Sequence, residues 1–147
     1  MSSDHSTFGS HEFNGRSIIM ENLRQHCIHK LLKNRKKAEK FFEYIAFIHK
    51  KCETRIDQKC SLEGIESIGM KYLDVEQCVE KTFVQSNEGG DKYEGENLVL
   101  EQMIKEWQLL GTHLQPGIVI NETPFRGQLN PYNVFEDICE AFTNMPN

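Results

Sequence analysis

Residues 114–127 have the sequence LQPGIVINETPFRG, and this segment is the most informative about the fold of the 147-residue chain. Its pattern predicts the end of a helix, a loop with Pro116, a short buried strand, a tight turn, a second strand and a glycine. Asn130 and Pro131 then predict a last helix, with the asparagine as cap and the proline at the first helical position. The buried face of that helix is expected to hold Val134, Phe135, Ile138 and Phe142.

Upstream of this segment, apolar residues recur at spacings of three and four, which indicates helices. One stripe starts near Leu23 and continues through the aromatic pair Phe41 and Phe42, which is expected in the core. Residues 62–68 predict a small helix that ends near Gly69. A capping box formed by Asp74 and Gln77 predicts another helix as far as about residue 84.

Two further predictions complete the secondary structure. Asn97 is expected to cap a helix whose buried face carries Leu100, Met103, Trp107 and Leu110. Residues 16–22 are expected to form a short buried strand. The first 14 residues hold almost nothing apolar to bury, so we expect a disordered tail over 1–14 and a single domain over 15–144.

Composition excludes several classes of protein. Apolar residues make up 38% and charged residues 27%, which is unlike a membrane bundle, a collagen repeat or a highly charged disordered chain. No apolar run approaches the roughly 18 residues of a transmembrane helix. The first residues also lack the basic and apolar regions of a signal peptide, so we expect no targeting segment or membrane anchor in this sequence.

Charge is unevenly distributed along the chain. The net charge is -5, yet residues 30–55 hold nine of the seventeen Lys and Arg residues and only three acidic ones. Aromatic residues do not alternate with these lysines as they do in a single-strand binding groove, so no nucleic-acid partner is expected. The simplest interpretation of this basic stretch is a solvated helix face at Lys33, Lys36, Lys37 and Lys40.

Five cysteines are many for an ordinary cytosolic domain. Cys27, Cys52, Cys60, Cys78 and Cys139 show neither a C-x-x-C motif nor the Cys/His spacing of a zinc site, so no metal and no cofactor are expected. Four of them could form two disulfides in three connectivities, which sequence does not distinguish. The fifth would be buried, reactive or bonded to another segment.

The order of elements at the C-terminal end resembles the second half of a thioredoxin-like fold. In that fold the proline before the strand is usually cis, and the matching residue here is Pro116. This resemblance leaves open a role in thiol–disulfide exchange. Cys27 would be the single reactive cysteine, because Arg24 stands where a second cysteine would be needed for a dithiol cycle. Other catalytic signatures, such as G-x-S-x-G or H-E-x-x-H, are absent from the sequence.

A more specific resemblance extends over nearly the whole chain. Residues 13–16 (FNGR) and 18–27 (IIMENLRQHC) are similar to the entry of the central luminal domain of plant-type vacuolar sorting receptors, a family that carries a protease-associated domain. Residues 116–121 (PGIVIN), 125–129 (FRGQL) and 138–142 (ICEAF) resemble the closing part of that domain. All five cysteines fall on positions that match the family.

This resemblance implies a fold and a function. The fold would be α/β and thioredoxin-like, helix-rich, with a helical insertion and a small mixed sheet. The function would be that of a non-catalytic module in a receptor that binds soluble vacuolar cargo proteins or propeptides for transport from the Golgi to the vacuole. Other domains of a longer receptor would be further partners, and a membrane would be reached only through an anchor outside this sequence.

Candidate cargo contacts follow from these expectations. Asn121, Glu122 and Arg126 surround the predicted hairpin, and Arg126 could bind a cargo carboxylate in a bidentate manner. The basic face at Lys33, Lys36, Lys37 and Lys40 is a second candidate. Asn121-Glu122-Thr123 is also an N-glycosylation sequon, which together with the cysteines favours the lumen of the secretory pathway (Golgi, prevacuolar compartment or vacuole).

Overall fold

The computed structural model describes residues 15–52, 55–84, 91–110 and 117–143. The chain forms two compact units, one up to residue 99 and one from residue 100 onward. The tail predicted over 1–14 and the cis peptide predicted at Pro116 lie outside the described residues and stay predictions. The single domain predicted over 15–144 also stays a prediction.

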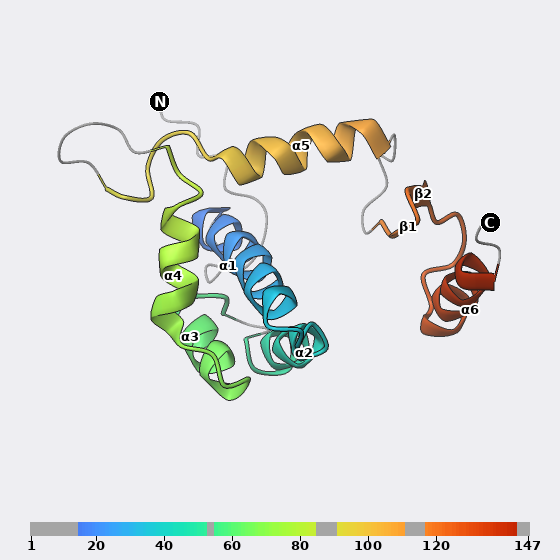
Figure 1. Ribbon diagram of the computed structural model, residues 1–147, viewed down its shortest axis with the longest axis horizontal. Helices are drawn as coiled ribbons and strands as arrows, with labels where there is room; N and C mark the ends of the chain where they lie inside the picture. The colour runs from blue at the N-terminus through green and yellow to red at the C-terminus, as the bar shows by residue number, and fades with distance from the viewer. Residues whose placement is uncertain (1–14, 53–54, 85–90, 111–116, 144–147) are drawn as a thin grey trace, which may run out of the picture. The chain divides into compact units, whose positions relative to one another are not determined.

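Helices build the first unit (Figure 1). Helix α1 packs against each of the three helices that follow it. The bounds are α1 (Gly15–Asn34), α2 (Lys40–Lys51), α3 (Gln58–Ser67) and α4 (Tyr72–Glu80). The core between them is formed by fully buried side chains from all four helices, namely Leu23, Ile28, Leu32, Tyr44, Ile65, Val75 and Val79.

The strand predicted over residues 16–22 is wrong, because this segment is the first part of α1. Only part of its apolar run faces the core: Met20 is buried, whereas Ile18 and Ile19 are 43% and 45% exposed. The buried positions continue from Met20 to Leu23 and Cys27 at helical spacing. The helical period that we placed after Leu23 therefore starts earlier.

The aromatic pair of α2 is also placed differently from the expectation. Phe42 is 74% exposed, and the fully buried aromatic residue of α2 is Tyr44. Phe41 lies in between and meets the ring of His29 edge-on at a centroid distance of 5.3 Å. Tyr44 reaches the core because it lies four residues before the buried Ile48, on the same face of the helix.

Helix ends are partly as predicted. The helix predicted to end near Gly69 does so: Gly69 has a φ of +76°, Met70 N–H donates to Ile65, and Gly69 N–H donates to Glu66, which is a Schellman motif. The capping box at Asp74 is wrong, because α4 starts at Tyr72 and places Asp74 within its first turn.

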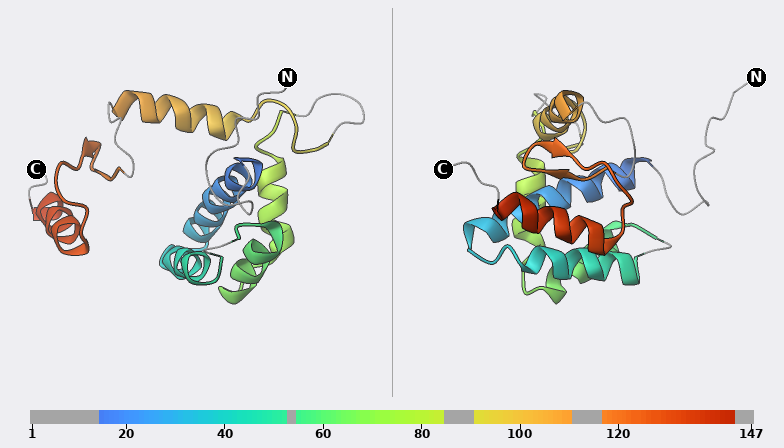
Figure 2. Two further views of the ribbon diagram at one scale, coloured as in Figure 1. Left: turned by 180° about the vertical axis from the view of Figure 1, so that it is seen from behind. Right: turned by 90° about the vertical axis from the view of Figure 1, so that its right-hand side faces the viewer.

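The second unit begins within α5 (Leu98–Leu110) and ends with α6 (Pro131–Thr143). Between them β1 (Val119–Ile120) and β2 (Thr123–Pro124) form an antiparallel hairpin, with Val119 opposite Pro124 and Ile120 opposite Thr123 (Figure 2). The intervening residues, Asn121 and Glu122, have φ values of +47° and +65°. Two positive φ values make this a type I′ turn, so the predicted tight turn is confirmed.

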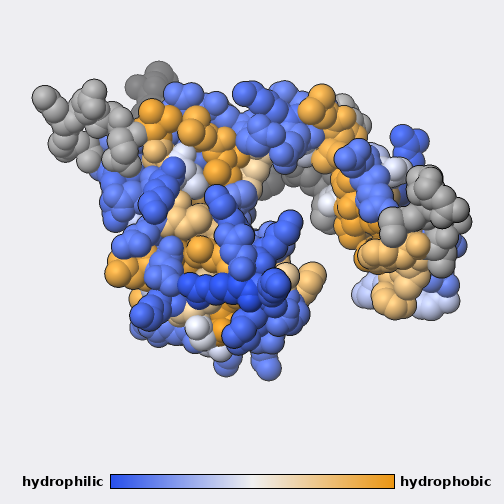
Figure 3. All heavy atoms as spheres, in the orientation of Figure 1, coloured by the Kyte–Doolittle hydropathy of each residue, from blue (hydrophilic) through white to orange (hydrophobic). Residues whose placement is uncertain are grey.

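Both predicted asparagine caps are present. The side chain of Asn97 accepts a hydrogen bond from Val99 N–H at the start of α5, and that of Asn130 accepts from Asn133 N–H at the start of α6. The buried face predicted for α6 is wrong, because Phe135, Ile138 and Phe142 are 64%, 37% and 71% exposed. Figure 3 shows apolar surface on this unit.

Candidate functional site

Two disulfides connect the helices of the first unit. Cys27 of α1 is bonded to Cys78 of α4, and Cys52 at the end of α2 is bonded to Cys60 of α3. The structure thus selects one of the three connectivities that the sequence left open for these four cysteines. Cys139 is exposed on α6, in the second unit.

Cys27 is poorly placed for thiol chemistry. Its side chain is fully buried and its sulfur is bonded to Cys78. It also lies well inside α1, whereas reactive cysteines usually lie at a helix N-terminus, where the backbone N–H groups stabilise a thiolate. Neither exposure nor helix position therefore favours the exchange chemistry that the sequence left open.

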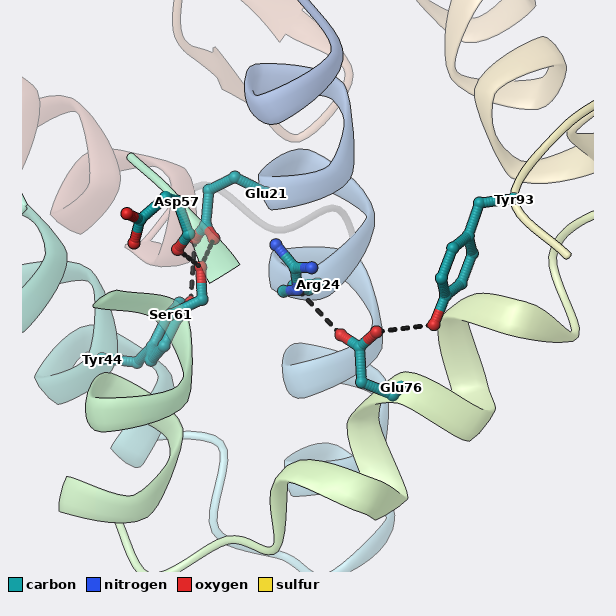
Figure 4. A network of polar contacts seen from close by, with 7 residues as sticks. All are labelled: Glu21, Arg24, Tyr44, Asp57, Ser61, Glu76 and Tyr93. Atoms are coloured by element: carbon teal, nitrogen blue, oxygen red, sulfur yellow. Dashed lines mark hydrogen bonds and ion pairs between the residues drawn. The ribbon is translucent and has the colours of Figure 1, made fainter. Parts of the chain in front are cut away.

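A buried carboxylate joins α1, α2 and α3. Glu21 is 2% exposed, and one of its carboxylate oxygens accepts a hydrogen bond from the Tyr44 hydroxyl at 2.9 Å. Its other oxygen accepts a short hydrogen bond from the Ser61 hydroxyl (Figure 4). Gln25 donates to Glu21 from one turn further along α1. These donors compensate the cost of burying a charge, and they fix the relative positions of the three helices.

A second buried cluster joins α1 to α4. Arg24 Nε donates to the carboxylate of Glu76 at 2.8 Å, and the two side chains are 6% and 9% exposed. The other carboxylate oxygen of Glu76 accepts from the Tyr93 hydroxyl at 2.7 Å (Figure 4). A cavity of about 320 Å³ lies beside these groups and is also lined by Arg16 and Gln58.

Burial and hydrogen bonding shift the ionisation of both clusters. Burial, followed by the nearby Glu21 carboxylate, raises the pKa of the Tyr44 hydroxyl, which therefore stays protonated as a donor. Burial opposes ionisation of Glu76, but the hydrogen bonds from Arg24 and Tyr93 outweigh it, so the pKa of the Glu76 carboxyl lies below its ordinary value. Burial likewise opposes the charge on Arg24, yet pairing with Glu76 raises the pKa of the guanidinium.

The predicted cargo contacts at the hairpin lie together on the surface of the second unit. Asn121 and Glu122 form the exposed turn, and Arg126 is exposed two residues after β2. The amide of Asn121 donates to the backbone carbonyl of Ala141 at 3.5 Å, so the turn contacts α6. The hairpin thus presents an amide, a carboxylate and a guanidinium within a short stretch of chain.

The basic face lies on the first unit. Lys33, Lys36 and Lys37 are exposed, whereas Lys40 is half-buried and its ammonium donates to the backbone carbonyl of Ile68 at 3.0 Å. Lys40 therefore has a structural role in joining α2 to the end of α3, and the three exposed lysines remain available to a partner.

The part of the chain that the structure describes contains no group of three or more His, Cys, Asp and Glu side chains arranged to hold a metal ion. Within the same residues, no helix has the length and hydropathy needed to cross a membrane. The arrangement is thus a disulfide-linked helical unit with paired buried charges, together with a unit that exposes a polar hairpin.

Comparison with known proteins gives the family. Residues 2–139 match the model of the vacuolar sorting receptor thioredoxin-like domain. The chain belongs to this family. The match to this family model confirms the predicted thioredoxin-like fold class. The structure agrees with the prediction of a helix-rich domain that has a small sheet. The two strands described here pair antiparallel.

The relatives of this vacuolar sorting receptor domain include vacuolar-sorting receptors of two plants, and they are much longer than this chain. The chain is 26% identical over 135 residues to vacuolar-sorting receptor 6 of Arabidopsis thaliana and 27% identical over 138 residues to vacuolar-sorting receptor 5 of the same plant. It is 25% identical over 137 residues to vacuolar-sorting receptor 1 of Pisum sativum. Each alignment covers 88% of this chain but only 20% or 21% of the relative. No solved structure matches the chain.

The sequence interpretation missed the two buried polar clusters. Glu21 stands within the segment that we assigned to a strand and Arg24 lies just after it, and their partners lie on other elements. The signal that could have found them is a charge at a position that the helical period places on the apolar face: Glu21 and Arg24 alternate with Met20, Leu23 and Cys27 on the buried side of α1.

Proposed function

We propose that this chain is a non-catalytic luminal module of a vacuolar sorting receptor, where it contributes to binding or presenting soluble cargo proteins for transport from the Golgi to the vacuole. The observation that carries the proposal is the family match over nearly the whole chain. Because the chain spans about a fifth of the length of the curated relatives that it matches, other domains of a longer receptor would share this work.

Two features support a luminal location. Structural disulfides persist in oxidising compartments and are rare in the cytosol, and the first unit contains two of them. The sequon residue Asn121 is exposed at the tip of the hairpin, where a glycosyltransferase could reach it. The secretory pathway lumen satisfies both requirements.

The non-catalytic character is supported by the state of Cys27. Thiol–disulfide exchange starts from an accessible thiolate, and this sulfur is fully buried in a bond to Cys78. The module would then act by binding cargo. The hairpin suits it, because the Arg126 guanidinium can make two parallel hydrogen bonds to a cargo carboxylate while Asn121 and Glu122 contact the peptide backbone.

A binding assay with a charge-swapped hairpin tests the proposal. The immobilised chain is incubated with a soluble vacuolar propeptide, and the double variant Glu122→Lys/Arg126→Glu is compared with the natural sequence. We expect the swap to weaken binding about fivefold or more without changing net charge, because a glutamate at position 126 repels the cargo carboxylate and a lysine at position 122 cannot accept hydrogen bonds from the peptide backbone. The measurement is the dissociation constant by surface plasmon resonance.

Helix α5 offers a matched control. Lys105→Glu/Glu106→Lys swaps two exposed charges in the same unit and also leaves net charge unchanged. It should bind as the natural sequence does. Equal binding by the hairpin swap and this control would remove the hairpin as a contact, and absence of binding by all three proteins would argue against the cargo role.

A further inference from the structure

We infer that a groove in the first unit binds an extended acidic peptide segment of a partner protein through its carboxylates and bulky apolar side chains. The groove has a volume of about 590 Å³ and lies apart from the hairpin in sequence and in unit. This inference deepens the proposed function and rests on it, since it names the chemistry of a segment that the module would take.

Residues of α1, α4 and the start of α5 line the groove. One set of lining residues comes from the second half of α1 and the residue just after it, and another from α4 and the two residues that follow it; the first residues of α5 also line the groove. The lining residues that matter here are Lys30, Leu31, Arg35, Asp74, Lys81 and Val99. Figure 3 shows apolar surface bordered by hydrophilic surface on the face of this unit over α1 and α4.

The charge of the groove is opposite to that of the chain. Lys30, Arg35 and Lys81 face a single carboxylate, Asp74, whereas the whole chain has a net charge of -5. Arg35 pairs with Asp74 at 2.9 Å. Lys30 and Lys81 make no ion pair within the described part of the chain, so their charges are available to carboxylates of a partner.

The lining also includes apolar groups. Leu31 and Val99 are half-buried, and Leu98 beside them is 56% exposed. A purely electrostatic site for a nucleic acid would gain nothing from these side chains, whereas a peptide can place an apolar side chain on them and its carboxylates toward the lysines. The lining therefore favours a peptide with acidic residues around an apolar one.

The walls of the groove are held at a fixed separation. Cys78 lines the groove, and its disulfide to Cys27 fastens α4 to α1. The buried ion pair between Arg24 and Glu76 joins the same two helices. Because the walls are fixed before a ligand arrives, binding does not have to order them.

Fluorescence anisotropy of the oxidised full chain tests the inference. The probe is a short fluorescein-labelled peptide in which glutamates flank a pair of leucines. Reversal of both unpaired charges in Lys30→Glu/Lys81→Glu should weaken its binding about tenfold or more, and Lys30→Gln/Lys81→Gln should have a smaller effect in the same direction. Higher salt should weaken binding to the natural sequence.

The control variant is Lys50→Glu/Lys59→Glu. Both lysines are exposed on α2 and α3, neither lines the groove, and the change in net charge is the same. It should bind the probe within about twofold of the natural sequence. Circular dichroism and the thermal midpoint of each variant establish that it is folded. Equal weakening by control and groove variants would overturn the inference, because net charge alone would then explain binding.

Two further probes separate other occupants. A peptide with serines in place of the leucines should bind at least about fivefold more weakly, because it leaves the apolar lining uncovered. If this peptide or single-stranded RNA bound as well as the leucine peptide, the groove would be a general polyanion site and the inference would be wrong. Competition of the probe by a second copy of the chain at micromolar concentration would also overturn it in favour of self-association.

The groove variants also separate this inference from the proposed function. In the propeptide assay, cargo binding that is lost in the hairpin swap but kept in Lys30→Glu/Lys81→Glu would leave the cargo role standing and overturn the groove as its site. Binding of the acidic probe with no binding of any propeptide would retain the groove and count against the cargo role.

Discussion

Arg24 and Glu76 form an ion pair at 2.8 Å in which both side chains are less than one-tenth exposed. They lie on α1 and α4, the same two helices that the Cys27–Cys78 disulfide joins. A covalent bond and a buried charge pair thus hold together the two walls of the proposed groove. The pair is more sensitive to change than a surface ion pair, because removal of one partner leaves an uncompensated charge in a largely buried site.

We therefore predict that Arg24→Met lowers the free energy of unfolding by about 3–5 kcal/mol, measured by urea denaturation. Arg35→Met is the matched control, because Arg35 pairs with Asp74 at a similar distance but with side chains 46% and 37% exposed. Its loss should cost less than about 1 kcal/mol. Equal effects of the two substitutions would show that the Arg24 pair is not the buried contact described here.

The pKa of Glu76 predicts a pH dependence. Burial raises the pKa of the Glu76 carboxyl, but the hydrogen bonds from Arg24 and Tyr93 lower it by more than burial raises it. The pKa in the folded chain therefore lies below the unfolded value of about 4.3. The stabilisation is then fully present above the unfolded pKa and is lost as the pH falls through the folded pKa. Comparison of unfolding free energies across this range should show the natural chain and Glu76→Gln converging as the pH falls. A difference that stays constant with pH would contradict the assignment.

The close packing around Gly64 of α3 predicts that a larger side chain at this position destabilises the first unit. A Cβ added at this position would lie 2.9 Å from Cε2 of Tyr44 and 3.0 Å from Cδ1 of Phe47, so one of these rings would have to move. Gly64→Ala should destabilise the first unit by about 1–3 kcal/mol despite the better helix propensity of alanine. Thermal unfolding of both variants measures the difference. Gly15→Ala, where nothing lies within 4 Å of the added Cβ, should be neutral or slightly stabilising. The reverse order would mean that α2 and α3 do not approach at Gly64.

The hairpin predicts partial N-glycosylation at Asn121 when the chain is produced in the secretory pathway of a plant cell. The turn exposes Asn121, but Pro124 follows the sequon directly and its fixed φ restricts the backbone there. Intact mass before and after enzymatic deglycosylation measures the occupancy. Thr123→Ala should abolish it and Pro124→Ala should raise it. An unmodified Asn121 in both the natural chain and Pro124→Ala would remove the sequon as an argument for the lumen.

The sequence predicted the local features of the fold better than the contacts between elements. The I′ turn at Asn121 and Glu122 and the caps at Asn97 and Asn130 depend on neighbouring residues, and all are present in the structure. Gly69 at the end of α3 is a further example, because only its own backbone conformation is needed to end the helix.

The errors arose where partners distant in sequence decide the outcome. Ile18 and Ile19 suggested a buried strand, but Glu21 is placed on the core side of a helix by Tyr44 and Ser61, which come from two other helices. Asp74 suggested a capping box, yet its partner is Arg35, 39 residues away. Local spacing carries no information about such partners, and for the same reason it left the disulfide connectivity open.

The most direct test of the luminal receptor module is the oxidation state of its cysteines in protein purified from its native host. The protein is alkylated under denaturing conditions with and without reductant, and peptides are mapped by mass spectrometry. We predict that Cys27, Cys52, Cys60 and Cys78 are unmodified without reductant and are recovered as the pairs Cys27–Cys78 and Cys52–Cys60. Alkylation of all four without reductant would place the chain in a reducing compartment and would contradict a role as a sorting-receptor module.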